Sequence, residues 1–252
     1  MLKGKRAVIT GVLQGIGRTA LEIFARNGAD IFACAYARTD EFESRCEELS
    51  VKNGVEISPI YCDMSDNESV KEAAREIQKA KKPVDALINI AGVNRDALFH
   101  MITIEQLRES FQINFFSQII FSQYITKIML RNGGGGGGGS KSVVFTSSVS
   151  AIDGNYGQLA YAASKAALIA AVKTMSKELG RSNIRVNAVA PGVIKSAMTA
   201  ALPPETIEKK LNKSALKRIG GSDEVANLFL FLASDRSRHI TGQTIRIDGG
   251  IG

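Results

Sequence analysis

The chain has 252 residues, of which 44% are hydrophobic and 23% charged, proportions that are ordinary for a globular protein. The net charge is +7, but the Lys and Arg residues are scattered, which argues against a nucleic-acid partner. No apolar run approaches the ~20 residues of a membrane span. Three cysteines without C-x-x-C spacing, Cys34, Cys46 and Cys62, predict no metal site and no disulfide framework, and so indicate a cytoplasmic protein.

The first predicted strand, Arg6–Thr10, runs into a glycine-rich turn and then a helix from about Arg18 to Asn27. Free backbone N–H groups and the positive end of the helix dipole make such a turn a phosphate site. The spacing is G-x-x-x-G-x-G, which differs from the G-x-G-x-x-G dinucleotide pattern, so a plain loop is the alternative. The residues expected to bind the nucleotide here are Gly11, Leu13, Gln14, Gly15, Ile16 and Gly17.

The second predicted strand, Asp30–Tyr36, ends without the acidic residue that binds a ribose 2′-hydroxyl in dinucleotide-binding folds. The first carboxylate after it is Asp40, and Arg38 is placed to pair with a 2′-phosphate. The alternative is that Arg38 is an ordinary exposed charge. We therefore expect NADP(H) as the cofactor, with NAD(H) possible.

Strands and helices continue to alternate, which predicts a single α/β domain over residues 1–252. The expected architecture is a Rossmann-type, doubly wound domain with a seven-stranded parallel sheet flanked by helices. Asp63 and Met64 follow the third strand, at the sheet edge where ligands bind. The remaining expected strands are Glu56–Tyr61, Val84–Ile90, Ser142–Thr146, Arg185–Ala190 and Thr244–Ile247, and further helices are Glu41–Lys52, Asn67–Ala80 and Asp223–Ala233.

Thr103–Arg131 reads as one long helix with a broad apolar face and Asn114 in its middle. A buried amide needs a partner, so Asn114 is either a satisfied core residue, a water ligand or the site of a bend. Gly133–Gly139 is expected to be a surface loop, without a functional account of its length. Lys195–Ile219, with a short helix near Glu205–Asn212, is a candidate substrate lid.

Tyr161 and Lys165 lie four residues apart in a predicted helix that runs to Leu179, and therefore share one helical face. A neighbouring ammonium stabilises a phenolate and lowers the tyrosine pKa toward the range useful for proton transfer. The alternative for this pair alone is a half-exposed helix face.

These motifs together resemble the short-chain dehydrogenase/reductase family over essentially the whole chain. They are Thr10-Gly11-x-x-x-Gly15-Ile16-Gly17, Asn89-x-Ala91-Gly92, Asn114, Ser148, Tyr161-x-x-x-Lys165 and Pro191-Gly192, in this order. Within the family the chain is most similar to the β-ketoacyl-(acyl-carrier-protein) reductases, on segments such as Arg185–Gly192 (RVNAVAPG) and Gly154–Tyr161 (GNYGQLAY).

The resemblance implies a role for each matching residue. Tyr161 would donate a proton to the substrate carbonyl, and Ser148, preferred over Ser147 by its spacing, would hydrogen-bond that oxygen. Lys165 would bind the nicotinamide ribose and lower the pKa of Tyr161, and Asn114 would hold a water. Further cofactor contacts are implied for the glycine turn and for Asp63, Met64, Asn89, Ala91, Gly92, Tyr161, Lys165, Pro191, Gly192 and Ile194.

Two residues depart from the family pattern. Ile90 stands where a second Asn is frequent, which weakens a supporting hydrogen bond, and the neutral Gln14 stands where NADP-preferring members often have a basic residue.

The resulting hypothesis is NADPH-dependent reduction of a 3-oxoacyl thioester in fatty acid biosynthesis. Alternatives are the same chemistry on a free ketone or alcohol (sugar, polyol or steroid), and a cofactor-binding scaffold without turnover. An acidic carrier protein would need basic residues near the mouth of the site, for which Arg131, Lys141 and Arg181 are candidates. The resemblance also implies a homotetramer, packed through the Thr103–Arg131 and Tyr161–Leu179 helices.

Overall fold

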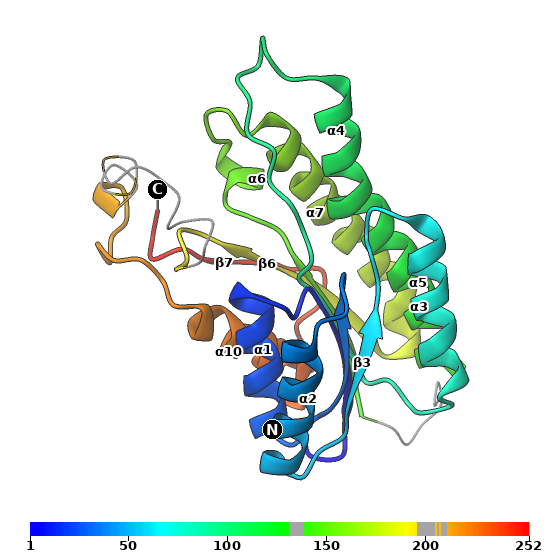
Figure 1. Ribbon diagram of the computed structural model, residues 1–252. Coiled ribbons are helices and arrows are strands. Elements are labelled where there is room, and N and C mark those ends of the chain that lie inside the picture. Colours follow the sequence, from blue (N-terminus) through cyan, green and yellow to red (C-terminus); the bar gives the residue numbers. More distant parts are fainter. Residues whose placement is uncertain (132–138, 196–204, 206, 208–210, 252) are drawn as a thin grey trace.

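Seven parallel strands form one sheet in the order β3-β2-β1-β4-β5-β6-β7 (Figure 1). The computed structural model describes residues 1–131, 139–195, 205, 207 and 211–251. The strands are β1 (Arg6–Thr10), β2 (Asp30–Ala35), β3 (Ile57–Tyr61), β4 (Ala86–Asn89), β5 (Lys141–Thr146), β6 (Ile184–Pro191) and β7 (Thr244–Ile247). β1, β4, β5 and β6 are buried along their whole length, as expected for strands covered on both faces.

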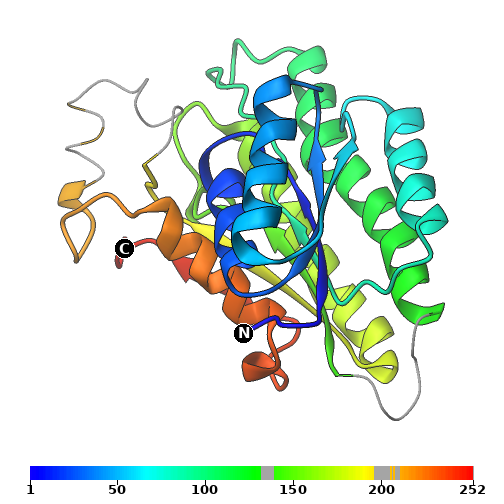
Figure 2. The ribbon, with the colours of Figure 1, turned by 60° about the horizontal axis from the view of Figure 1, so that its bottom comes forward.

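Helices cover both faces of this sheet and enclose two hydrophobic cores. On one face lie α1 (Gly15–Arg26), α2 (Asp40–Asn53) and α10 (Ser222–Ala233), and on the other lie α3 (Asn67–Lys79), α5 (Ser117–Arg131) and α7 (Leu159–Leu179) (Figures 1 and 2). The strand order reverses between β1 and β4, and open α/β sheets bind ligands at the carboxyl ends of the strands around such a point.

The predicted parallel seven-stranded fold is confirmed, and most element boundaries lie within two residues of expectation. The first helix begins at Gly15 rather than Arg18, because the glycine turn closes directly into the first helical turn. A short helix that the sequence did not predict, α6 (Ser150–Asp153), follows β5.

The predicted helical stretch over Thr103–Arg131 is confirmed, but it is not α-helical throughout. It consists of α4 (Ile104–Phe111), a π-helical segment (Gln112–Phe116) and α5, which follow one another without a break. The sequence did not predict the π-helical segment, which is a single short turn. Asn114 lies at the centre of the π-helical segment.

Some predictions fall on residues outside the described ranges. These are the loop Gly133–Gly139, except for its last residue, and most of the candidate lid with the helix near Glu205–Asn212. Among the described residues, no helix is both long and apolar enough to cross a membrane.

Candidate active site

The glycine turn between β1 and α1 is fixed by close backbone approaches. Gly11 has φ +76°, and a methyl group on it would lie 2.9 Å from the Ala91 Cα. A methyl group on Gly17 would lie 2.0 Å from the Gly11 carbonyl oxygen. Gly15 also has a positive φ, of +54°, but open space lies in front of it. The turn therefore needs glycine at Gly11 and Gly17 for packing, and leaves Gly15 accessible from outside.

The N-terminus of α1 fits a diphosphate. The residue before the helix, Gln14, makes no side-chain capping bond, and the first turn holds no acidic residue. In an α-helix each N–H donates to the carbonyl four residues earlier. For Gly15, Ile16 and Gly17 that carbonyl lies before the helix begins, so their N–H groups are free to bind an anion. Leu13 packs against the hydrophobic core beside them. This geometry suits the diphosphate of a nicotinamide dinucleotide.

At the end of β2, Arg38 belongs to a small ionic cluster. Its Nε lies 3.1 Å from Glu43 Oε1, and its guanidinium lies 4.8 Å from the centre of the Tyr61 ring. Tyr61 in turn donates its hydroxyl to Glu43 at 2.6 Å. The hydrogen bond with Tyr61 and the charge of Glu43 raise the pKa of Arg38. Arg38 is 72% exposed, so a 2′-phosphate could reach it but would compete with Glu43.

Asp63 and Met64 follow β3 and differ in exposure. Asp63 is exposed, and its carboxylate accepts hydrogen bonds from the backbone and hydroxyl of Ser65. The Met64 side chain is buried in the core, and its carbonyl accepts from Ser117 Oγ at 2.7 Å. An adenine ring could therefore meet Met64 through its backbone rather than its side chain.

The end of β4 is tied to β1 and α5 by hydrogen bonds. Thr10 Oγ1 accepts from the backbone N–H groups of Ile90 and Ala91 at 3.0 and 3.2 Å. Asn89 is fully buried and donates to Ser122 Oγ at 3.0 Å, whereas its Oδ1 has no partner within the described part of the chain. Ile90, the departure from the family pattern, still contributes its backbone N–H to this junction.

Asn114 is a satisfied core asparagine. Its Oδ1 accepts from the Val93 N–H at 2.8 Å, and its Nδ2 donates to the Val93 carbonyl and to Ser164 Oγ at 2.9 and 3.0 Å. The π-helical turn brings this amide against the irregular segment that follows Gly92. A methyl group on Gly92 would lie 3.0 Å from Asn114 Oδ1 and 3.1 Å from Lys165 Nζ, so the three groups meet at one point.

The two adjacent serines after β5 have different surroundings. Ser147 is buried and donates its hydroxyl to the Lys165 carbonyl at 2.9 Å. Ser148 accepts from the Ser150 N–H at 3.1 Å and hydrogen-bonds the phenol of Tyr161. Of the two, Ser148 is the one that faces the candidate proton donor.

The pKa of Tyr161 differs in direction from the expectation. Burial raises the pKa of this phenol, the hydrogen bond with Ser148 opposes that effect, and the charge of Asp96 adds to the rise. Lys165 Nζ lies 6.0 Å from the ring centre. The net shift in the pKa of Tyr161 is opposite to the predicted lowering, because burial is the largest effect on this phenol.

Lys165 is only 2% exposed and donates to the Thr146 carbonyl at 2.8 Å. Burial lowers the pKa of its ammonium from 10.5 to about 7. Burial removes most of the hydration of the charged form, and no carboxylate of the described residues pairs with it. The amine of Lys165 therefore gives up its proton more readily than an exposed lysine does.

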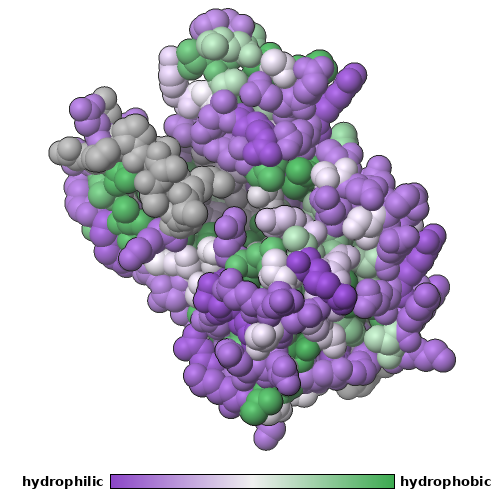
Figure 3. Space-filling model, viewed as in Figure 1, coloured by the Kyte–Doolittle hydropathy of each residue, from purple (hydrophilic) through white to green (hydrophobic). Residues whose placement is uncertain are grey.

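The segment after β6 completes the edge. Gly192 donates its N–H to the Ile247 carbonyl at 3.0 Å, and a methyl group on it would lie 2.6 Å from Asp248 Cβ. Pro191 is buried as the last residue of β6, and Ile194 packs in the core. A band of apolar and neutral residues crosses this face, between the lobe of α4 and α6 and the lobe of α1 and α2 (Figure 3).

A family model described as enoyl-(acyl carrier protein) reductase matches residues 11–252. The chain is 38% identical to the 3-oxoacyl-(acyl-carrier-protein) reductase FabG of Thermotoga maritima, over 99% of this chain and 98% of that protein. The chain belongs to the short-chain dehydrogenase/reductase family. It is accordingly an NAD(P)-dependent oxidoreductase.

Other relatives of this short-chain dehydrogenase/reductase carry different names. It is 34% identical to a 3alpha-hydroxysteroid dehydrogenase of Mediterraneibacter gnavus, over 99% of this chain and 97% of that protein. It also matches the crystal structure of an L-sorbose reductase from Gluconobacter frateurii, complexed with NADPH and L-sorbose. That match has a TM-score of 0.89 and 25% identity, and covers 99% of this chain and 97% of the other.

The sequence did not predict the groups that hold the candidate residues in place. Three of them are the Thr146 carbonyl, the Val93 peptide and the Ser164 hydroxyl, which also donates to the Tyr161 carbonyl at 2.8 Å. Backbone groups carry no side-chain signal. Ser164 could have been predicted to lie near the site, because it is three residues after Tyr161 in the same helix and so lies on a similar side of it.

The basic residues proposed for a carrier protein do not surround this site within one chain. Lys141 is buried, donates to the Met129 carbonyl, and has its pKa lowered by burial. It starts β5, whereas Ser148 follows the end of that strand, so about 20 Å separate them. Arg131 and Arg181 are exposed at the same far edge. The expectation that Lys141 lies near the mouth of the active site is wrong, because Lys141 is at the opposite end of β5 from Ser148.

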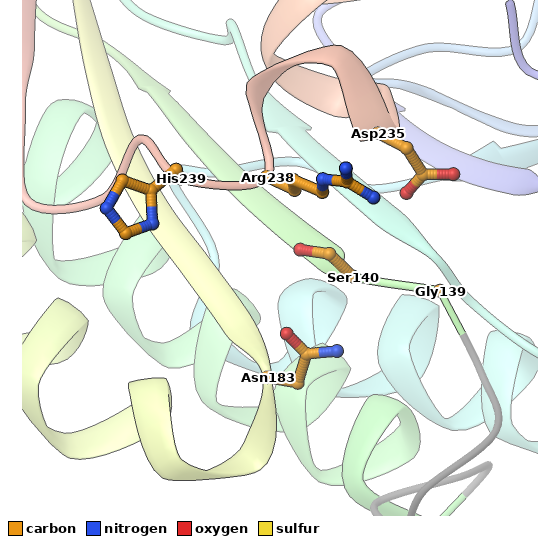
Figure 4. Close-up of a pocket in the computed structure, with 6 residues that line it drawn as sticks. All are labelled: Gly139, Ser140, Asn183, Asp235, Arg238 and His239. Atoms are coloured by element: carbon orange, nitrogen blue, oxygen red, sulfur yellow. The ribbon is translucent and has the colours of Figure 1, made fainter.

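A pocket of about 680 Å³ lies at this far edge of the reductase. Asp235, beside Arg238 in Figure 4, forms an ion pair with Lys5 at 2.7 Å. A strand length separates the pocket from Tyr161, so it takes no part in the site described above. Its lining residues are Gly139, Ser140, Asn183, Asp235, Arg238 and His239 (Figure 4).

Proposed function

We propose that this protein is an NADPH-dependent reductase of 3-oxoacyl thioesters on acyl carrier protein. The product is the 3-hydroxyacyl thioester, a step of fatty acid biosynthesis, which takes place in the cytoplasm. The observation that carries the substrate assignment is the 38% identity to a 3-oxoacyl-(acyl-carrier-protein) reductase over 99% of the chain. The chemistry is supported by Ser148, Tyr161 and Lys165, which the fold brings to one sheet edge.

The nicotinamide coenzyme supplies the hydride, and the protein supplies position, charge and the proton. Tyr161 donates its phenolic proton to the carbonyl oxygen of the substrate. The phenol of Tyr161 is protonated at neutral pH, which is the form that ketone reduction requires. Ser148 donates a hydrogen bond to the same oxygen and stabilises its developing negative charge.

Lys165 holds the nicotinamide ribose, and its charge stabilises the phenolate that remains after proton transfer. In the chain without ligand its ammonium has only the Thr146 carbonyl as a protein partner within the described residues. Two further N–H groups are therefore available for ribose hydroxyls. Asn114 keeps the Val93 peptide beside Lys165, next to the position proposed for a water that links Lys165 to solvent.

The preference for NADPH rests on Arg38. Its exposed guanidinium follows β2, and Asp40 and Glu43 lie on the adjoining helix. The 2′-phosphate would displace the single contact to Glu43 and gain a charge-assisted pair. NAD(H) remains the competing cofactor, and the neutral Gln14 at the glycine turn adds nothing to either choice.

A homotetramer is the proposed assembly. Exposed large apolar residues on α4, the π-helical segment and α5 support a contact there, since apolar side chains on a helix face usually bury against a partner. They are Ile104, Phe116 and Leu130, which are 53%, 49% and 39% exposed. Light scattering of the purified protein would give the assembly size directly.

The second candidate is the same reaction on a free ketone or alcohol, favoured by the similarity to a hydroxysteroid dehydrogenase and an L-sorbose reductase. Initial rates with acetoacetyl thioesters, ketosteroids and ketoses, each with NADPH, distinguish the two. We expect the highest kcat/KM with the acetoacetyl thioester. A higher value with a free ketone overturns the substrate assignment, and no turnover with any of them favours a cofactor-binding scaffold.

A further inference from the structure

Arg246, in the edge strand β7, joins segments that lie far apart in the sequence. Its NH1 and NH2 groups donate to the two carboxylate oxygens of Asp153 at 3.0 and 2.7 Å. Its Nε donates to Asp248 at 2.7 Å, and NH2 also donates to the Ile251 carbonyl at 2.6 Å. One guanidinium therefore connects the end of α6 with the turn that follows β7.

The first of these connections leads to Ser148. α6 begins two residues after Ser148, and its first N–H donates to the Ser148 hydroxyl at 3.1 Å. The Ala151 N–H donates to the Ser148 carbonyl at 3.0 Å, so two hydrogen bonds join Ser148 to the single helical turn. Asp153 ends this turn, and Arg246 fixes that end from outside.

The second connection leads to the segment after β6. Asp248 packs directly on Gly192, where an added methyl group would lie 2.6 Å from its Cβ. The Gly249 carbonyl accepts from the hydroxyl of Ser214 and the N–H of Leu216, at 2.8 and 3.0 Å. The turn after β7, which Arg246 binds, therefore packs against the segment around Gly192. We expect that segment to face the nicotinamide.

We propose that Arg246 is a positioning residue that fixes the Ser148 hydroxyl relative to the Gly192 segment. The inference rests on the proposed role of Ser148 as the group that binds the carbonyl oxygen. The contacts of Arg246 lead to Asp153, Asp248 and the Ile251 carbonyl, and its proposed effect on Ser148 acts through Asp153 and Asp248. A planar guanidinium can bind two carboxylates and a carbonyl at once, whereas a lysine ammonium offers no bidentate geometry.

A surface ion pair without consequence is the competing interpretation, because exposed pairs usually contribute little. Two features distinguish this one. The contacts form a network of four hydrogen bonds, in which the side chains of Arg246, Asp153 and Asp248 are 33%, 45% and 8% exposed. The network also joins Asp153 to Arg246, which lie 93 residues apart in the sequence, so it connects two distant segments of the chain.

Hydrogen exchange on the full-length protein, measured by mass spectrometry without substrate, tests the local effect. We expect the amides of Ala151–Gly154 to exchange about tenfold faster in Arg246→Gln and Asp153→Asn than in the wild type. The matched control is Arg45→Gln on α2, which loses ion pairs to Glu41 and Glu22. Unchanged exchange in Ala151–Gly154, or an equal rise throughout β5 and β6, overturns the proposal.

Steady-state kinetics tests the positioning role. We expect kcat to fall about tenfold in Arg246→Gln and Asp153→Asn, with the coenzyme KM within twofold, and the double variant to be no worse than either. Arg246→Lys should recover little, and Arg45→Gln should retain the wild-type kcat. A wild-type kcat in Arg246→Gln refutes the role. Any ketone that the wild type reduces can be used, so a wrong substrate assignment does not affect this test.

Discussion

Replacing Lys165 with Met should change stability in a pH-dependent way. The Lys165 ammonium is 2% exposed, its protein partner is the Thr146 carbonyl at 2.8 Å, and burial lowers its pKa from 10.5 to about 7. A lowered pKa on a base means that the folded chain disfavours the charged form. At low pH both states carry this charge, but only the native state keeps it buried, so the charge opposes folding there.

The size of this effect follows from the two pKa values. Their difference corresponds to about 5 kcal/mol, which opposes folding below pH 7. Between pH 7 and 10.5 the unfolded chain holds a proton that the folded chain has released, so wild-type stability rises with pH. Met removes the charge but leaves the Thr146 carbonyl without its donor, a loss of about 1–3 kcal/mol. The net expectation at pH 6 is a stabilisation of about 2–4 kcal/mol.

Urea unfolding of the wild type and Lys165→Met, at one protein concentration from pH 6 to 10, measures this difference. Other titrating groups are common to both proteins and cancel in the comparison. We expect Lys165→Met to be the more stable protein at pH 6, and the gap to close and reverse as the pH approaches 10.5. The fixed concentration matters, because subunit assembly would shift both curves.

Lys173→Met is the matched control, since Lys173 is exposed on the same helix. Its stability relative to the wild type should stay constant over the range. A Lys165→Met curve that also runs parallel to the wild type, or lies below it at pH 6, would refute the idea that the buried ammonium costs stability.

Five further variants test the proposed site. Tyr161→Phe should lower kcat at least 10³-fold, since general acid catalysis contributes roughly 10²–10⁴-fold, and should leave NADPH binding, measured by fluorescence titration, within twofold. Ser148→Ala should lower kcat about 10²-fold, the loss typical for one oxyanion donor, whereas Ser147→Ala should lower it less than tenfold; the reverse order would reject the assignment. Arg38→Ala should raise the NADPH KM about tenfold and leave the NADH KM unchanged. Glu43→Gln should lower the NADPH KM, because it removes the charge that competes with the 2′-phosphate for Arg38. Equal effects on the KM values of both coenzymes would remove the argument for NADPH.

The fold could be predicted because the buried strands are short apolar runs, each followed by a helix of different periodicity. β1 and β5 are examples, and the positive φ of Gly11 explains why glycine marks the first turn. The candidate residues themselves, including the choice of Ser148 over Ser147, were predicted from spacing and resemblance. Their contacts agree with that choice, since Ser148 lies against Tyr161.

The rest depends on contacts between distant segments. The sequence shows Arg38 as a free charge, but the Glu43 that pairs with it comes from the next helix. The shift in the pKa of Tyr161 was predicted from Lys165, its neighbour on the helix, to be downward. Burial of the phenol raises that pKa instead. Lys141 looked like a surface residue in a polar stretch, and only the packing of α5 against β5 buries it.

The register of β5 decides which serine serves the site. Three consecutive residues at its end contact α7: the Thr146 carbonyl accepts from Lys165 Nζ, Ser147 Oγ donates to the Lys165 carbonyl, and Ser148 hydrogen-bonds Tyr161. A slip of one residue in the pairing of β5 would move both serines away from these partners. Pairing with both β4 and β6 fixes the register of β5. The central position of this strand therefore specifies the hydroxyl that faces the phenol, while α6 and Arg246 specify how closely it is held.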